Sequence, residues 1–239
     1  MKNLSTTAKA YILGTILVGL VLIGWIVQTL DWTNPWLYLV AALGGVAQTL
    51  KLEGPNARTN YSVAWFVYGF AFLAFGPVAA MFVVTVSHLV EWAWYKYPWY
   101  IQCFNIGNHL MSVFVASLAF GLVNRGSGLI DAVSAAALLA ANLAFVLANH
   151  FLVGVVVKLA RHQSFAESGV FAFLTVFLDF CVLCMGTITA LVWRVNPFTA
   201  VLNILPLYLL YNALRVPALQ RQVQELKGMG SAAEPASGD

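Results

Sequence analysis

The chain has 239 residues, of which 61% are hydrophobic and only 9% are charged, and its formal net charge is +3. Soluble domains carry about 25% charged residues. The composition therefore excludes an ordinary soluble domain and indicates a protein that folds within a lipid bilayer. All three cysteines lie in or beside apolar segments, which excludes the disulfide framework of a small secreted protein.

The apolar segments predict an all-α fold, a polytopic membrane helical bundle of about eight transmembrane helices. The first segment follows Lys9 and ends without a small-residue cleavage site, so we interpret it as a retained span and not as a signal peptide. The run over 63–95 is too long for one span of about 20 residues, and Gly76-Pro77 divides it because proline disfavours helix at and before its position. The predicted spans cover 9–30, 35–50, 63–75, 77–95, 103–123, 130–157, 169–193 and 197–214.

The distribution of basic residues predicts that both termini are cytoplasmic. With this orientation, all Lys and Arg residues except Arg125 and Arg194 lie on the cytoplasmic side. The segment 63–75 is short for a span, and a re-entrant segment buried by its neighbours is the alternative. Polar residues over 51–61 and basic residues over 158–168 predict cytoplasmic loops. The cytoplasmic basic residues are Lys2, Lys9, Lys51, Arg58, Lys96, Lys158, Arg161, Arg215, Arg221 and Lys227.

The composition divides the chain into three parts. The transmembrane helical domain is predicted over 1–215. Apolar residues then recur at helical spacing among charged and polar residues, which predicts a cytoplasmic amphipathic helix over 216–227. The last residues, 228–239, are small and polar, and we expect a disordered tail there.

Costly polar residues gather at one predicted depth of the bilayer. His88, His109 and His150 each lie within two helical turns of a predicted cytoplasmic helix end, roughly 10 Å inside the inner face. Glu91 shares a helix face with His88 at a spacing of i+3. Polar side chains inside a bilayer usually face the bundle interior, so we expect one shared polar cavity that opens toward the cytoplasm. The same layer holds Asn105, Asn108 and Asn149.

Several roles are open for this layer. The imidazoles could bind a ligand, hold a metal or haem iron, or relay and sense protons. Alternatively, each imidazole makes its own interhelical hydrogen bond and Glu91 reaches toward the inner interface.

Asp179 lies near the middle of the span over 169–193, where a charge costs about 2.5–3.5 kcal/mol on insertion scales. We expect it to face the bundle, either as a functional group or as a protonated carboxyl paired with an asparagine or a backbone carbonyl.

No soluble catalytic motif, phosphate-binding glycine loop or metal-ligand motif such as HExxH occurs. The sequence therefore predicts no bound cofactor and no nucleic-acid partner, and it favours a binding protein over an enzyme.

Short motifs lie at the ends of several predicted helices. They are Asn60-Tyr61-Ser62, Phe75-Gly76-Pro77, Pro98-Trp99, Phe104-Asn105, Leu205-Pro206-Leu207-Tyr208 and Arg215. This arrangement resembles the membrane-embedded sensor modules that precede diguanylate cyclase (GGDEF) or HD-GYP phosphodiesterase domains in bacteria. The resemblance covers residues 35–215 and implies signal perception with no catalytic residues. The GGDEF sequence and the His-Asp pair of the output domains do not occur in this chain.

The leading functional hypothesis is an integral membrane sensor or input module of the cell inner membrane, which transmits a ligand or membrane signal to a cytoplasmic output. A transport protein, or the substrate-binding subunit of a transporter, is the alternative, with the polar layer and Asp179 as its pathway. A membrane metal or haem redox protein is a further alternative. The expected partners are membrane lipid and a cytoplasmic signalling partner or output domain, with a second copy of the chain as a further candidate.

Overall fold

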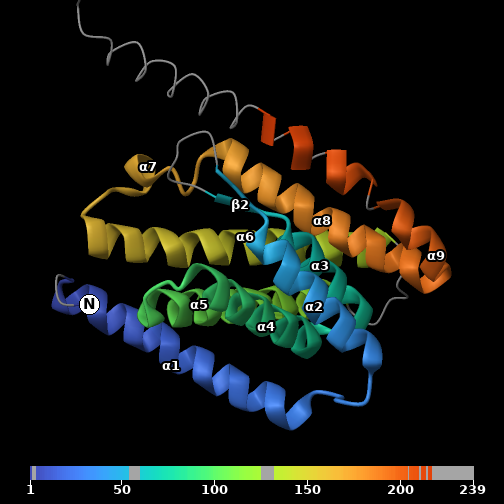
Figure 1. The fold of residues 1–239 in the computed structure, drawn as a ribbon, viewed down its shortest axis with the longest axis horizontal. Coiled ribbons are helices and arrows are strands. Elements are labelled where there is room, and N and C mark those ends of the chain that lie inside the picture. Colours follow the sequence, from blue (N-terminus) through green and yellow to red (C-terminus); the bar gives the residue numbers. More distant parts are fainter. Residues whose placement is uncertain are drawn as a thin grey trace, which may run out of the picture.

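The fold was analysed in a computed structural model, which describes residues 1, 4–53, 60–124, 132–203, 205–209, 211–213 and 215–216. The described chain is a bundle of helices with one short pair of strands (Figure 1). Within the described ranges, five helices are long and apolar enough to cross a membrane. The expected helical membrane bundle is therefore confirmed at this level, while the count of eight spans stays a prediction. The five are α1 (Thr6–Thr29), α4 (Pro77–Tyr95), α5 (Trp99–Val123), α6 (Ala132–Arg161) and α8 (Phe173–Val195).

Two further helices, α2 (Pro35–Thr49) and α3 (Ala64–Phe75), are shorter than the bilayer is thick. The 12 residues of α3 extend only about 18 Å, against a hydrocarbon core of roughly 30 Å. Between α2 and α3, strand β1 (Lys51–Glu53) pairs antiparallel with β2 (Asn60–Ser62). The prediction of a polar loop over 51–61 is therefore wrong at both ends of this segment, because the ends pair with each other as two short strands.

The boundaries at proline and glycine follow the expected chemistry. Gly76 adopts φ 93°, a left-handed conformation that ends α3, and Pro77 begins α4 immediately afterwards. Pro98 precedes the first residue of α5, so this helix begins at Trp99, one turn before the predicted start at 103. The sequence reading placed this turn of helix wrongly in the connecting loop.

Two other connections differ from the predictions. The basic segment over 158–168 is mostly helical: α6 continues to Arg161, and Ser164 and Glu167 cap the short helix α7 (Phe165–Ser168). The single span predicted over 197–214 begins instead with α9 (Pro197–Ala200) and a 3₁₀ turn. The amphipathic helix and the tail predicted beyond 216 lie outside the described residues.

Hydrogen bonds show which helix ends lie together. The Ser5 hydroxyl donates to the Leu159 carbonyl over 3.4 Å, and the Tyr11 hydroxyl donates to the Leu152 carbonyl over 3.0 Å, so the start of α1 lies beside the end of α6. The N-terminus and α7 mark this end, and α9 marks the opposite end (Figure 1). At the opposite end, Arg194 donates to the Leu73 carbonyl over 2.6 Å.

The distribution of side chains between the interior and the surface is inverted relative to a soluble protein. Leu17 of α1 is 64% exposed and Leu122 of α5 is 76% exposed, whereas Ser87, Gln102 and Asn108 are completely buried. Apolar exteriors with polar interiors are the pattern of helices that face lipid.

Glycines allow the short helices to pack closely on their neighbours. A side chain at Gly44 of α2 would collide with Ser87 of α4, and a Cβ at Gly186 of α8 would overlap the Phe66 carbonyl of α3. Small residues permit such close approach of membrane helices. The glycines therefore bring α2 close to α4 and α3 close to α8, and Ala64, the first residue of α3, is completely buried.

Candidate functional site

A cavity of about 210 Å³ lies at the end of the bundle that carries the N-terminus. Ser62 of β2 and Trp65 of α3 line it, so the cavity lies beside the start of α3. Helices α4, α5, α6 and α8 form its walls, and the ends of α2 and the strand pair close one side. The lining residues are Gln48, Lys51, Ser62, Trp65, His88, Asn105, Asn108, His109, Asn149, His150, Val153, Val170, Thr175 and Asp179.

Seven of the eight site residues expected from the sequence line this cavity. The eighth, Glu91, does not line the cavity and is completely buried. It contacts His88, whose Nδ1 atom lies 2.8 Å from the Glu91 Oε2 atom. It does not reach toward an interface. The structure therefore brings the predicted polar layer together in one place.

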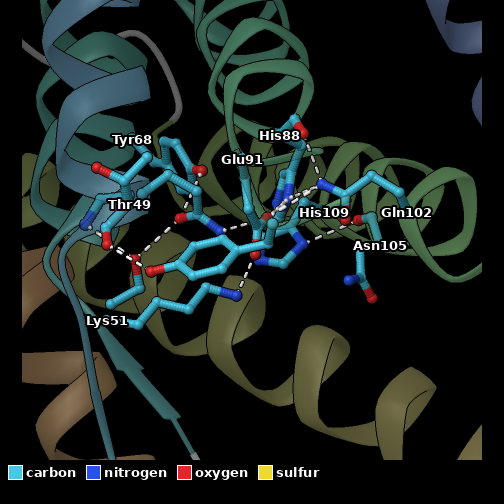
Figure 2. Close-up of polar contacts among 12 residues, drawn as sticks. Thr49, Lys51, Tyr68, His88, Glu91, Gln102, Asn105 and His109 are labelled. Atoms are coloured by element: carbon cyan, nitrogen blue, oxygen red, sulfur yellow. Dashed lines mark hydrogen bonds and ion pairs between the residues drawn. The ribbon is translucent and has the colours of Figure 1, made fainter. Parts of the chain in front are cut away.

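Glu91 is the centre of a buried hydrogen-bond network (Figure 2). Its Oε2 atom accepts from the amide groups of Gln48 and Gln102, each over 3.0 Å. Its Oε1 atom forms an ion pair with Lys51, the first residue of β1. Charged hydrogen bonds of this kind offset the large desolvation of a buried carboxylate. The network therefore fixes α2, β1, α4 and α5 against one another.

The sequence reading missed the amide partners in this network. The Gln48 Oε1 atom accepts from the Ser62 hydroxyl over 2.9 Å and from the Tyr68 hydroxyl over 3.3 Å. Gln102 also donates to the His88 carbonyl over 2.6 Å. Gln48 lies in the apolar span predicted over 35–50, where a polar side chain signals a buried contact. Gln102 lies just before the span predicted over 103–123, so its position in the sequence gives no such signal.

His88 and His109 are in direct contact. Their ring centroids lie 4.5 Å apart, as the expected shared cavity requires. The His109 Nδ1 atom lies 2.9 Å from the Asn105 carbonyl, which can only accept, so Nδ1 carries the proton. A backbone bond of this kind fixes the tautomer and the direction of the ring.

His150 and Asp179 form the second polar pair of the cavity. The His150 Nε2 atom lies 3.0 Å from the Asp179 Oδ2 atom, and both side chains are buried. The carboxyl faces the bundle as expected, although its partner is an imidazole of α6 and not the asparagine or carbonyl considered from the sequence. Trp65 packs against one histidine of each pair. Its ring centroid lies 6.0 Å from that of His109, which contacts His88, and 6.2 Å from that of His150.

Several buried polar atoms of the lining have no hydrogen-bond partner among the described residues. They are His88 Nε2, both amide atoms of Asn108, and Asn149 Nδ2. These atoms come from three different helices, α4, α5 and α6. A buried polar group without a partner costs about 1–3 kcal/mol, so the arrangement is suited to a molecule that supplies the missing partners.

The side chains do not form a metal centre. Among the described residues, no group of three or more His, Cys, Asp or Glu side chains is arranged to hold a metal ion. The contact between His88 and His109 leaves no room for a porphyrin between two axial imidazoles. The metal and haem alternatives therefore gain no support from this geometry.

Comparison with known proteins adds no family assignment. No protein-family model matches the chain, and no similar protein was found among curated proteins or solved structures.

Proposed function

We propose that the chain is an integral membrane sensor or input module that binds a small polar ligand in the cavity and signals to a cytoplasmic output. The observation that supports this proposal most directly is the set of unpartnered buried atoms on His88, Asn108 and Asn149, three residues that line one cavity from three helices. A ligand that forms hydrogen bonds with these atoms removes the cost of leaving them unpaired, and this contributes to the binding free energy. Groups exposed to water could not contribute in this way, because they already bond to water.

Helix α8 is the element suited to carry the signal. Thr175 and Asp179 of α8 line the cavity, so occupancy acts on this helix directly. Trp65 of α3 also lines it, and α3 contacts α8 through Gly69 and Gly186 with almost no intervening side chain. The chain then leads from α8 through α9 toward the C-terminal segment, where a cytoplasmic partner would read the change.

The expected orientation places the cavity in the cytoplasmic half of the inner membrane. Among the described residues, Lys9, Lys51, Lys96, Lys158 and Arg161 lie at the cavity end of the bundle, and Arg194 lies at the other end. Positively charged residues favour the cytoplasmic side. The ligand would therefore enter from the cytoplasm or along the inner leaflet.

Hydrogen–deuterium exchange tests this function on the full chain in lipid nanodiscs. Addition of a polar small-molecule extract of the host cells should slow exchange around His88, Asn108 and Asn149 and should change exchange after Val195. Asn108→Leu should abolish both effects, whereas Asn142→Leu, which removes a buried asparagine outside the cavity, should keep them. Equal responses in wild type and Asn108→Leu, or no response around the cavity in either, would overturn the proposal.

Transport is the second candidate, because another cavity lies at the opposite end of the bundle. This cavity has a volume of about 290 Å³ and includes Asp31 and Asn34 in its lining. Tyr68, Phe72 and Phe145 lie around a small apolar pocket in the region between the two cavities. Uptake of solute into liposomes that contain the purified chain would favour transport over sensing.

A further inference from the structure

The formally charged residues that line the cavity each have an ionisable partner within the protein. Lys51 and Asp179 are the lining residues, among those described, that carry a formal charge, apart from the histidines. Lys51 pairs with Glu91, and Asp179 pairs with His150. A ligand with a net charge would have to disrupt one of these pairs or remain buried without a counter-charge, and both are costly. The charge balance thus favours an uncharged ligand.

The unpartnered atoms define the hydrogen bonds that this ligand must make. When His88 donates its Nδ1 proton to Glu91, its Nε2 atom is left as an acceptor. Asn108 offers one acceptor and two donor hydrogens, and the Asn149 nitrogen offers two donor hydrogens. A complementary ligand therefore needs a donor and an acceptor on the same edge.

The aromatic lining constrains the shape of the ligand. The indole of Trp65 and the imidazoles of His109 and His150 all belong to the lining, with the indole plane at 83° to the first imidazole and at 52° to the second. The cavity volume is about 210 Å³, so the occupant is small. Flat ring faces stack favourably on flat ligands.

We propose that the cavity binds a small, uncharged, planar molecule that carries a donor and an acceptor side by side, as a primary aromatic carboxamide does. This inference rests on the proposed function, because it names the ligand class of the same cavity. Asn108 pairs with the amide edge, His88 accepts a further hydrogen, and Trp65 covers the ring.

Nicotinamide, urea and adenine are suitable probes of this class, since each is uncharged and carries an amide-type edge. Binding is measured by isothermal titration with the full chain in nanodiscs. Nicotinate and N,N-dimethylnicotinamide serve as matched controls, because the first carries a negative charge and the second lacks the amide donors. At least one probe should bind saturably, and both controls should bind about tenfold more weakly than nicotinamide, the equivalent of one or two lost hydrogen bonds.

Variants assign the binding to the cavity. Asn108→Leu should weaken probe binding about tenfold or more, and Asn142→Leu should leave it unchanged. Should Asn108→Leu fail to fold, as judged by its elution profile and thermal transition, Asn149→Leu replaces it. The ligand class would be overturned if nicotinate bound as tightly as nicotinamide. It would also be overturned if Asn108→Leu and Asn149→Leu both bound the probes with the wild-type affinity. A response to the host-cell extract without binding of any probe overturns this inference alone and leaves the proposed function standing.

Discussion

Lys51, at the first position of β1, forms an ion pair with Glu91, whose side chain is completely buried near the end of α4. This pair joins the strand hairpin to the long helix that carries His88. Lys51→Met should destabilise the protein by roughly 1–3 kcal/mol, because it leaves the Glu91 carboxylate buried with one oxygen unpaired. Chemical unfolding in detergent measures this change.

The control for this variant is Lys96→Met, which removes an exposed lysine from the turn between α4 and α5. Its stability should stay within about 0.5 kcal/mol of wild type. The double variant Lys51→Met with Glu91→Gln should be more stable than Lys51→Met alone, since the uncompensated charge is then gone. Equal stability of Lys51→Met and wild type would show that the pair contributes nothing.

His150 and Asp179 should be energetically coupled. A double-mutant cycle with His150→Leu and Asp179→Leu should give a coupling free energy of about 0.5–2 kcal/mol, because each single variant leaves a buried partner unsatisfied. Thermal unfolding of the four proteins in the same detergent provides the cycle. Strictly additive effects would contradict the hydrogen bond between the two side chains.

Gly186→Ala should lower stability and separate α3 from α8. A methyl group at this position would overlap the backbone carbonyl of Phe66, so the helices must move apart. Gly24→Ala on α1 is the matched control, because no atom lies within 4 Å of its added methyl group. The control should be neutral or slightly stabilising, since alanine favours helix over glycine by about 1 kcal/mol. Unfolding temperatures that fall equally in both variants would argue against the close contact.

The cap of α7 should depend on pH. Backbone and side-chain hydrogen bonds from Ser164 lower the pKa of Glu167 below its usual value of 4.5. A carboxylate with a lowered pKa stabilises the fold above its unfolded pKa, and this contribution is lost as pH falls through the folded pKa. An NMR titration of the Glu167 carboxyl carbon should therefore have its midpoint below 4.5. Ser164→Ala should raise the midpoint toward the ordinary value, and a titration that is identical in the variant would contradict the capping role.

The orientation in the membrane can be measured by cysteine labelling. In a background with Cys103, Cys181 and Cys184 replaced by serine, Gly126→Cys should react with an impermeant reagent added outside intact cells. Gln163→Cys should react only after permeabilisation, because the basic end of the bundle is expected to face the cytoplasm. Labelling with the reverse pattern, or of both positions from one side, would refute the cytoplasmic location of the cavity.

The sequence by itself determined the membrane character and most helix positions, because these depend on local hydrophobicity and on breaks at proline and glycine. The predicted bounds 77–95 coincide with helix α4, and Gly76 divides the apolar run where expected. Depth along a helix also follows from residue count. His88, His109 and His150 could therefore be assigned to one layer before the fold was known.

The tertiary structure decided which of these groups meet, because depth does not fix the direction in which a helix faces. Only helix packing places the His88 ring on His109 and gives Asp179 an imidazole from α6 as its partner. It also brings Gln48 into the Glu91 network from a segment 43 residues away, which residue spacing cannot predict. The cavity itself also depends on this packing, because its lining includes residues from α4, α5, α6 and α8 and from the strands β1 and β2.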